Sequence, residues 1–243
     1  NWLRLIAKSF LAGKKIILLH GGGPQIDEEM KLHGVERNFI EGYRYTDNAT
    51  FDVVEMVLAG KVQQQFVRAL RSLGVPAVGI TGSDGGLFTV GEKLSPSGMA
   101  LGQVGDVKAV NPKLLQSLLD GGFLPVVSSV SSLDSGLGMN VNADLAAGAI
   151  AGAFAADQVI FMTDVIGLMR KYPDEGTKID EISSGELERL MPSLREGMIP
   201  KVEAVLNALK FGAKSALIID GRSASPLEAA LNGSAIGTLV THG

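Results

Sequence analysis

The chain has 243 residues, of which 46% are hydrophobic, and a formal net charge of −4 at pH 7. This length suffices for one large α/β domain, and the net negative charge without long basic runs argues against a nucleic-acid partner. Because the chain has no cysteine and only the scattered His20, His33 and His242, disulfides and thiolate zinc sites are excluded, and no protein-bound metal is expected. No apolar run reaches the about 18 residues that a membrane span needs, so we expect a soluble, cytoplasmic protein without a membrane partner.

An amphipathic pattern at residues 2–11 predicts a helix at the start of the chain. Short β-branched runs then alternate with helical patterns, which is typical of a largely parallel sheet covered by helices on both faces. Gly60 is a candidate bend or break in the longest of these helices. The expected strands are at 15–20, 77–81, 124–130, 158–163 and 216–220, and the expected helices at 49–73, 112–119, 143–155, 186–191, 201–211 and 226–231.

The segment from Gly82 to Gly105 is rich in glycine and serine and contains two short apolar runs, at 87–90 and 101–104. This pattern predicts an antiparallel β-hairpin inserted into the α/β frame. We therefore expect a three-layer αβα sandwich around a mainly parallel sheet. No linker divides the chain, so we expect a single domain over 1–243, with an N-terminal lobe (1–155) and a C-terminal lobe (156–243) that share one sheet.

The strand that ends at His20 runs directly into Gly21, Gly22 and Gly23, and a helix is expected to follow. Glycines let the backbone approach a ligand closely, and a helix N-terminus offers unpaired N–H groups to an anion. The segment has neither the G-x-G-x-x-G spacing of dinucleotide sites nor the ending of a Walker A loop. It is therefore a candidate anion site, with a plain strand-to-helix turn as the alternative.

Two further segments carry polar residues that suit a charged ligand. Arg44 offers a planar fork that can hold a carboxylate bidentately, although a surface salt bridge is the simpler interpretation. Asn142 fits the N-cap of the helix that follows it. A single N-cap does not also require Asn140 and Asp144. An aspartate at a helix start can orient lysines or interact with a metal-bound phosphate.

The C-terminal half supplies two more candidates. Lys201 lies just after Pro200 at the start of a helix, where the helix dipole disfavours a cation, so either a function or full solvation explains it. Asp164 ends a strand, at the position where open α/β sheets bind ligands, or it caps the next turn.

In their order along the chain, these segments resemble the amino-acid kinase family over almost the entire sequence. Within the family, they are most similar to the members that act on N-acetylglutamate. The matching motifs are His20-Gly-Gly-Gly-Pro-Gln25, Gly42-Tyr-Arg-Tyr-Thr-Asp47, Glu55-Met-Val-Leu-Ala-Gly-Lys61, Gly105-Asp-Val107, Asn140-Val-Asn-Ala-Asp144, Thr163-Asp-Val-x-Gly167, Gly197-Met-Ile-Pro-Lys201 and Ile219-Asp-Gly-Arg222.

The resemblance implies transfer of the γ-phosphoryl group of MgATP to the side-chain carboxylate of N-acetyl-L-glutamate, in arginine biosynthesis. It places the acyl substrate on the N-terminal lobe and the nucleotide on the C-terminal lobe. The implied catalytic residues are Gly22, Asp144 and Lys201; the implied substrate-binding residues are Gly21, Gly22, Arg44 and Asn140; and the implied nucleotide-binding residues are Asp164, Leu168, Met198 and Lys201.

The family pattern also begins with a strand that carries Lys-x-Gly-Gly, which would precede Asn1, and its members form homodimers or larger homo-oligomers. Two alternatives stay open at this point. One is a related kinase that acts on carrier-bound aminoadipate in lysine biosynthesis. The other is a catalytically silent homologue that senses a ligand.

Overall fold

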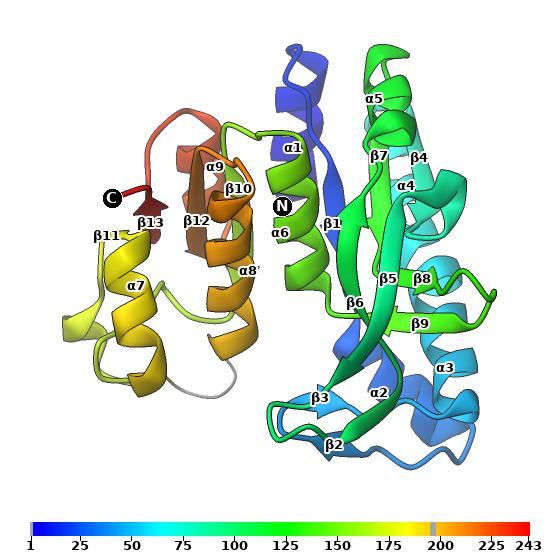
Figure 1. Cartoon of the computed structure of the whole chain (residues 1–243). Coiled ribbons are helices and arrows are strands. Elements are labelled where there is room, and N and C mark those ends of the chain that lie inside the picture. Colours follow the sequence, from blue (N-terminus) through cyan, green and yellow to red (C-terminus); the bar gives the residue numbers. More distant parts are fainter. Residues whose placement is uncertain (1, 195–197) are drawn as a thin grey trace. The chain divides into compact units, whose positions relative to one another are not determined.

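The computed structural model describes residues 2–194 and 198–243 (Figure 1). Contacts divide the chain into two compact units: a first unit of residues 14–146, and a second unit of residues 1–13 and 147–243. The expected lobe boundary at 155/156 differs from this division for two reasons. Helix α6 (Ala143–Ala153) continues through the division point, and helix α1 (Trp2–Leu11) packs on α9 (Ser225–Leu231), close to the other end of the chain.

The first unit contains a three-stranded parallel sheet in the order β1 (Leu18–His20), β7 (Leu124–Ser128), β4 (Ala77–Thr81). All five residues of the central strand β7 are buried, as expected for an apolar run in a parallel sheet. Helix α4 (Gln63–Ser72) packs on β4 and β7, and α5 (Lys113–Asp120) packs on β7. Helix α2 (Gly23–Leu32) follows β1 directly.

The long helical stretch of the first unit consists of α3 (Asn48–Glu55), a π-helical segment η1 (Met56–Val62) and α4. Gly60 lies within η1, so the backbone stays helical there and widens instead of breaking. Val54, Val57 and Leu58 of this stretch are buried in a hydrophobic cluster with Ile26 and Met30 of α2. This packing holds α2 against η1 and so positions the loop between β1 and α2.

The expected hairpin is present and longer than predicted, with β5 (Phe88–Leu94) antiparallel to β6 (Ala100–Val110). Figure 1 shows this curved pair beside β9 (Gly138–Val141), which runs parallel to β6 and antiparallel to β8 (Val130–Ser132). A two-stranded ribbon of β2 (Phe39–Ile40) and β3 (Tyr43–Arg44) completes the first unit. Gly102 of β6 has φ +71°, and a Cβ there would lie 2.2 Å from the Thr46 carbonyl oxygen, so only glycine allows this approach.

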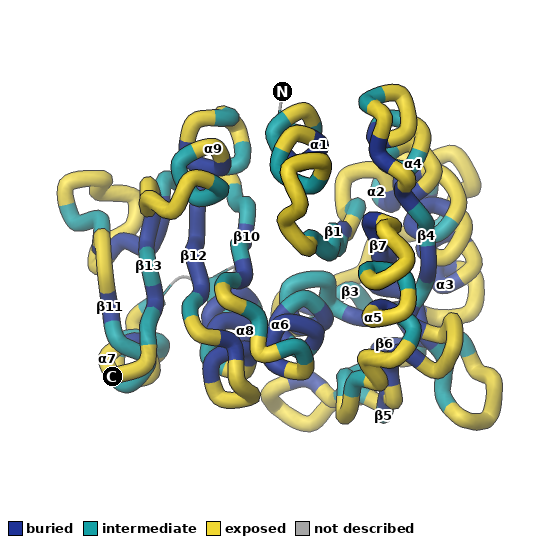
Figure 2. The backbone as a smooth tube through the Cα atoms, turned by 90° about the horizontal axis from the view of Figure 1, so that it is seen from above, coloured by how far each residue is buried: buried dark blue, intermediate teal, exposed yellow. Residues whose placement is uncertain are grey.

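The second unit is built on a four-stranded mixed sheet in the order β10 (Val159–Thr163), β12 (Ser215–Asp220), β13 (Thr238–Thr241), β11 (Glu181–Ser183). β12 is parallel to β10 and antiparallel to β13, and β13 is parallel to β11. Figure 2 shows α9 on one side of this sheet, and α7 (Ser184–Leu190) and α8 (Ile199–Lys210) on the other. The second unit is therefore three-layered, with the buried strand β12 at its centre.

The predicted α/β class with parallel strands and an inserted hairpin is confirmed. The expectation that both halves share one sheet stays a prediction. β1 is an edge strand of the first unit's sheet, and β10 is an edge strand of the second unit's sheet. Short 3₁₀ turns occur at Asp84–Gly86, Glu175–Thr177 and Met191–Ser193.

No helix within the described ranges combines the length and the apolar composition needed to cross a bilayer.

Candidate functional site

The glycine loop joins β1 to α2, and Gly22 occupies the N-cap position of that helix. A Cβ on Gly22 would lie 2.8 Å from Leu58 Cδ2 and 3.3 Å from Val62 Cγ2, both in η1. A Cβ on Gly21 would lie 3.3 Å from Ala143 Cβ, at the start of α6. A side chain at Gly22 would therefore crowd η1, and one at Gly21 would crowd the start of α6.

His20, the last residue of β1, is only 7% exposed. Its Nδ1 lies 3.0 Å from the Gly21 carbonyl oxygen, and its ring centroid lies 5.2 Å from that of Phe66 in α4. Burial lowers the pKa of His20, because desolvation disfavours the imidazolium form, and the Gly21 contact only partly opposes this. The sequence patterns had marked His20 as part of a motif without giving it a task.

Arg44 lies at the end of β3 with its side chain only 9% exposed. Its Nη2 donates to Asp27 Oδ1 at 2.6 Å, its Nη1 donates to Met30 Sδ at 3.2 Å, and its guanidinium carbon lies 4.9 Å from the Phe39 ring centroid. The salt bridge expected as the simpler alternative does form, but on a largely buried side chain. Asp27 therefore orients the arginine fork, a role that the sequence did not reveal.

Thr46 connects Arg44 to Asn140. This threonine is fully buried, and its Oγ1 donates to the Arg44 carbonyl oxygen at 3.0 Å while accepting from Asn140 Nδ2 at 3.2 Å. Asn140 lies on β9, which is far from β3 in the sequence. The structure thus brings together two of the predicted substrate-binding residues, through a third residue that sequence reasoning had not selected.

The start of α6 holds two of the other polar candidates. Asn142 Oδ1 accepts a hydrogen bond from the Leu145 backbone N–H at 3.1 Å, which confirms its predicted role as a helix cap. Asp144 lies in the first turn of α6, where the helix dipole stabilises a carboxylate. Because Ala143 is the residue nearest to the Gly21 Cβ position, Asp144 follows directly after the point where α6 approaches the glycine loop.

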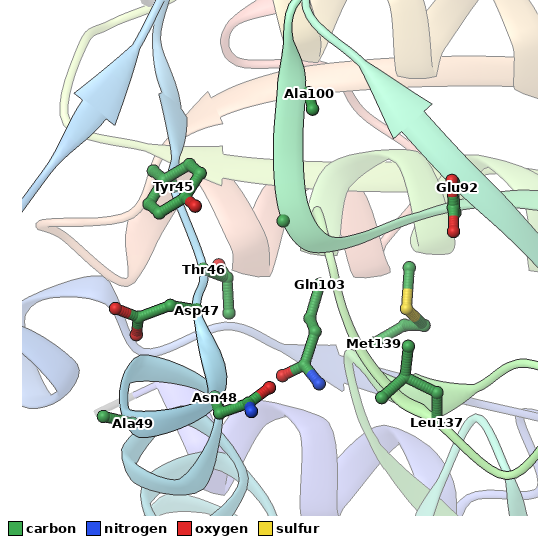
Figure 3. A pocket seen from close by; sticks show the side chains of 11 residues that line it. Tyr45, Thr46, Asp47, Asn48, Ala49, Glu92, Ala100, Gln103, Leu137 and Met139 are labelled. Carbon is green, nitrogen blue, oxygen red and sulfur yellow. The ribbon is translucent and has the colours of Figure 1, made fainter.

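A pocket of about 570 Å³ lies beside Thr46 in the first unit (Figure 3). Asp47 and Glu92 supply its charged lining, with no lysine or arginine among the described lining residues, so it does not suit a dianionic ligand. Asp47 caps α3 by accepting from the Thr50 backbone N–H at 2.8 Å, and this bond lowers the Asp47 pKa. None of the predicted site residues lines this pocket.

In the second unit, all four predicted nucleotide-binding residues line one cavity of about 80 Å³. Asp164 is exposed, and its Oδ1 accepts from Thr163 Oγ1 at 3.2 Å. The Leu168 side chain is buried, and its backbone N–H donates to Thr238 Oγ1 at 2.8 Å. Met198 and Lys201 come from the start of α8, whereas Gly197 of the same motif lies outside the described residues.

Lys201 is the third residue of α8 and is only 9% exposed. Its Nζ lies 5.4 Å from the centroid of the Phe161 ring on β10, within range of a cation–π interaction. The alternative of a fully solvated lysine is therefore wrong. The helix dipole disfavours a cation at this position, and Lys201 lines the same cavity as the other three predicted nucleotide-binding residues, so it stays a candidate for contact with phosphate.

Comparison with known proteins identifies the family of the chain. The sequence profile of the amino acid kinase family matches residues 1–220. The chain belongs to the amino acid kinase family.

Acetylglutamate kinase of Paraburkholderia phymatum is 41% identical over 220 residues, which cover 87% of this chain and 73% of that protein. Acetylglutamate kinase of Acidothermus cellulolyticus is 44% identical over 218 residues, which cover 87% of this chain and 74% of that protein. The crystal structure of smu.665 from Streptococcus mutans UA159 superposes with a TM-score of 0.83 at 27% identity, covering 100% of this chain and 92% of that one. The predicted family is thereby confirmed.

In this amino acid kinase, the predicted site residues form two groups, each within one unit. The first unit holds Gly21, Gly22, Arg44, Asn140 and Asp144, and the second holds Asp164, Leu168, Met198 and Lys201. Sequence reasoning missed Asp27 and Thr46, which position Arg44 and Asn140. No group of three or more histidine, cysteine, aspartate or glutamate side chains suited to a metal ion occurs among the described residues.

Proposed function

We propose that this amino acid kinase transfers the γ-phosphoryl group of MgATP to the side-chain carboxylate of N-acetyl-L-glutamate, giving N-acetyl-L-glutamyl 5-phosphate and ADP in arginine biosynthesis. The observation that carries the proposal is the sequence identity of this chain with two acetylglutamate kinases, which is 41% and 44% over 87% of the chain. The contacts within each unit support it, as follows.

Arg44 and Asn140 are the proposed contacts for the acyl substrate. Each terminal nitrogen of Arg44 makes one contact, Nη1 with Met30 and Nη2 with Asp27, and the guanidinium has further N–H donors that can hold the α-carboxylate of acetylglutamate. The hydrogen bonds through Thr46 hold the Arg44 backbone and the Asn140 amide in fixed relation. Such preorganisation lowers the entropy cost of binding a small, flexible acid.

The reaction needs alignment more than proton transfer. The attacking carboxylate is already ionised at neutral pH, since a glutamate side chain has a reference pKa of about 4.3. One of its oxygens bonds to the γ-phosphorus while the bond to the β–γ bridging oxygen breaks, and the electron pair leaves with ADP. In this proposal, the N–H groups of Gly21 and Gly22 and the Lys201 ammonium neutralise charge on the transferred group, and the task that the family resemblance implies for Asp144 is to orient lysine side chains of the site.

The second unit is the proposed nucleotide side. The cavity that contains Asp164, Leu168, Met198 and Lys201 is smaller than the about 300 Å³ typical of enclosed ligand sites, so it suits one portion of ATP and not the whole molecule. The magnesium ion arrives as part of the MgATP substrate. Assembly into a homodimer or larger homo-oligomer and a cytoplasmic location stay predictions.

An assay of purified protein with MgATP, in which the acyl phosphate is trapped by hydroxylamine, tests the proposal. N-acetyl-L-glutamate should give the hydroxamate, and N-acetyl-L-2-aminoadipate, which is one methylene longer, should react about 10- to 200-fold less efficiently in kcat/KM. Preference for the longer acid would favour the aminoadipate-type alternative. ATP binding by calorimetry without any hydroxamate would contradict the proposed activity and favour the silent homologue.

A further inference from the structure

His20 precedes the glycine loop directly and has no part in the roles assigned above. It is almost fully buried between that loop and Phe66 of α4. Its two ring nitrogens differ: Nδ1 lies 3.0 Å from the Gly21 carbonyl oxygen, whereas the buried Nε2 has no hydrogen-bond partner among the described residues. This asymmetry determines where the proton resides.

A carbonyl oxygen only accepts hydrogen bonds, so the contact with Gly21 requires a proton on Nδ1. Because burial lowers the pKa of His20, the ring is neutral at physiological pH and carries one proton. The neutral tautomer is therefore the Nδ1–H form, with the lone pair on Nε2.

This hydrogen bond fixes the orientation of the peptide group between Gly21 and Gly22. That peptide is trans, and the C=O and N–H bonds of a planar trans peptide point in opposite directions. When His20 holds the Gly21 carbonyl on its own side, the Gly22 N–H must point to the opposite side. Without such a hold, a peptide between two glycines can rotate easily, because no Cβ restricts either residue.

We infer that His20 is a positioning residue for phosphoryl transfer: its Nδ1–H orients the Gly21–Gly22 peptide so that the Gly22 N–H is preset for the γ-phosphoryl group. The inference rests on the proposed function, in which Gly22 supplies that donor. A donor that is already oriented needs no reorganisation in the transition state, whereas a rotating peptide would have to be ordered in every turnover.

Three substitutions separate the Nδ1–H from the rest of the ring. His20→Asn keeps an N–H donor at the place of Nδ1, His20→Gln moves the donor one bond further out, and His20→Leu removes it. His20→Leu and His20→Gln should lower kcat about 10- to 100-fold and change the KM for acetylglutamate less than about threefold, with melting temperatures near that of the wild type. His20→Asn should keep kcat within about threefold of the wild type.

Equal kcat values for all three variants would overturn the inference, as would an equal loss in His20→Asn and His20→Leu. A parallel fall of kcat, acetylglutamate affinity and melting temperature would show a merely structural role and would also overturn it.

Nitrogen-15 NMR of protein labelled at histidine supplies a readout that does not depend on activity, with the His20→Asn spectrum assigning the His20 signals. A proton on Nδ1 and an unprotonated Nε2 are expected, and the opposite tautomer would overturn the inference. If the wild type makes no hydroxamate, the proposed function fails, and the NMR spectrum still decides whether His20 holds the Gly21 carbonyl.

Discussion

The two groups of candidate residues are held in different ways. In the first unit, Asp27, Arg44, Thr46 and Asn140 form a continuous series of hydrogen bonds between 2.6 and 3.2 Å. In the second unit, the nucleotide-side residues share a small cavity in which Lys201 lies near the Phe161 ring. Fixed donors suit the directional recognition of a small acid, whereas a cavity whose described lining is mainly apolar and includes Lys201 and Asp164 suits part of a nucleotide.

The largest expected effect tests the cation of the second unit. Lys201→Ala should lower kcat about 100- to 1000-fold and leave the KM for acetylglutamate nearly unchanged, because the proposed partner of Lys201 is charge that develops in the transition state. Steady-state kinetics with the hydroxamate assay measures both constants. A comparable loss in kcat and in acetylglutamate affinity would place Lys201 in substrate binding instead.

Lys210→Ala is the matched control for Lys201→Ala. Lys210 is the last residue of the same helix α8 and is exposed, and a cation there is favourable for the helix dipole. Its removal should leave kcat and KM unchanged. If both alanine variants lost activity equally, the effect would lie in the stability of α8, which melting temperatures would reveal.

The next largest effect tests the close packing of Gly22 in the glycine loop against η1, in the first unit. Gly22→Ala places a Cβ 2.8 Å from Leu58 Cδ2, so the buried Leu58 side chain, the loop or η1 must shift. We expect kcat/KM to fall about 10- to 100-fold, because a small misplacement of reacting groups costs about that much, together with a lower melting temperature. Gly23→Ala is the control, since a Cβ at Gly23 has no atom within 4 Å. Similar behaviour of the two variants would show that the loop tolerates side chains.

Local patterns in the sequence were sufficient to predict much of the fold. The strand at 77–81 and the helix at 2–11 have the predicted bounds, because apolar periodicity reports directly on which face of an element is buried. The N-cap at Asn142 was also predictable from the local sequence, because asparagine is a favoured N-cap residue. The strands β8, β9, β11 and β13 were not predicted, because each has only three or four residues, and the pairing of β11 with β13 also depends on a partner that is distant in the sequence.

The candidate site was predictable as a set of residue types but not as a network. Nothing in the sequence near Arg44 indicates that Asp27, on another element, holds its guanidinium. A threonine is an ordinary residue in a turn, and only the fold shows that Thr46 is buried and bonded to both Arg44 and Asn140. Periodicity also could not reveal that β1 lies at the edge of the first unit's sheet and β10 at the edge of the second unit's sheet, since each strand has the same apolar pattern at an edge or at the centre.

The smallest of the expected effects tests the directional recognition proposed for the first unit. Arg44→Lys keeps the positive charge but replaces the planar fork with a point charge, which cannot contact Asp27 and a substrate carboxylate together in the same geometry. The KM for acetylglutamate should rise about tenfold, as expected from the loss of one charged hydrogen bond, while kcat changes little. Titration calorimetry with acetylglutamate gives an independent measure of the same loss.

Arg37→Lys is the matched control for Arg44→Lys. Arg37 Nη1 also pairs with Asp27 Oδ2, at 3.1 Å, and the Arg37 guanidinium carbon lies 4.8 Å from the Phe39 ring centroid. The Arg37 side chain, however, is 62% exposed. An exposed ion pair contributes little, since solvent screens both charges, so this variant should match the wild type in KM. An unchanged KM in Arg44→Lys would rule out the carboxylate fork. A rise of KM in both variants would mean that Asp27, and not the Arg44 fork, controls the binding of the acid. The directional recognition by the first unit would then come from the Asp27 carboxylate.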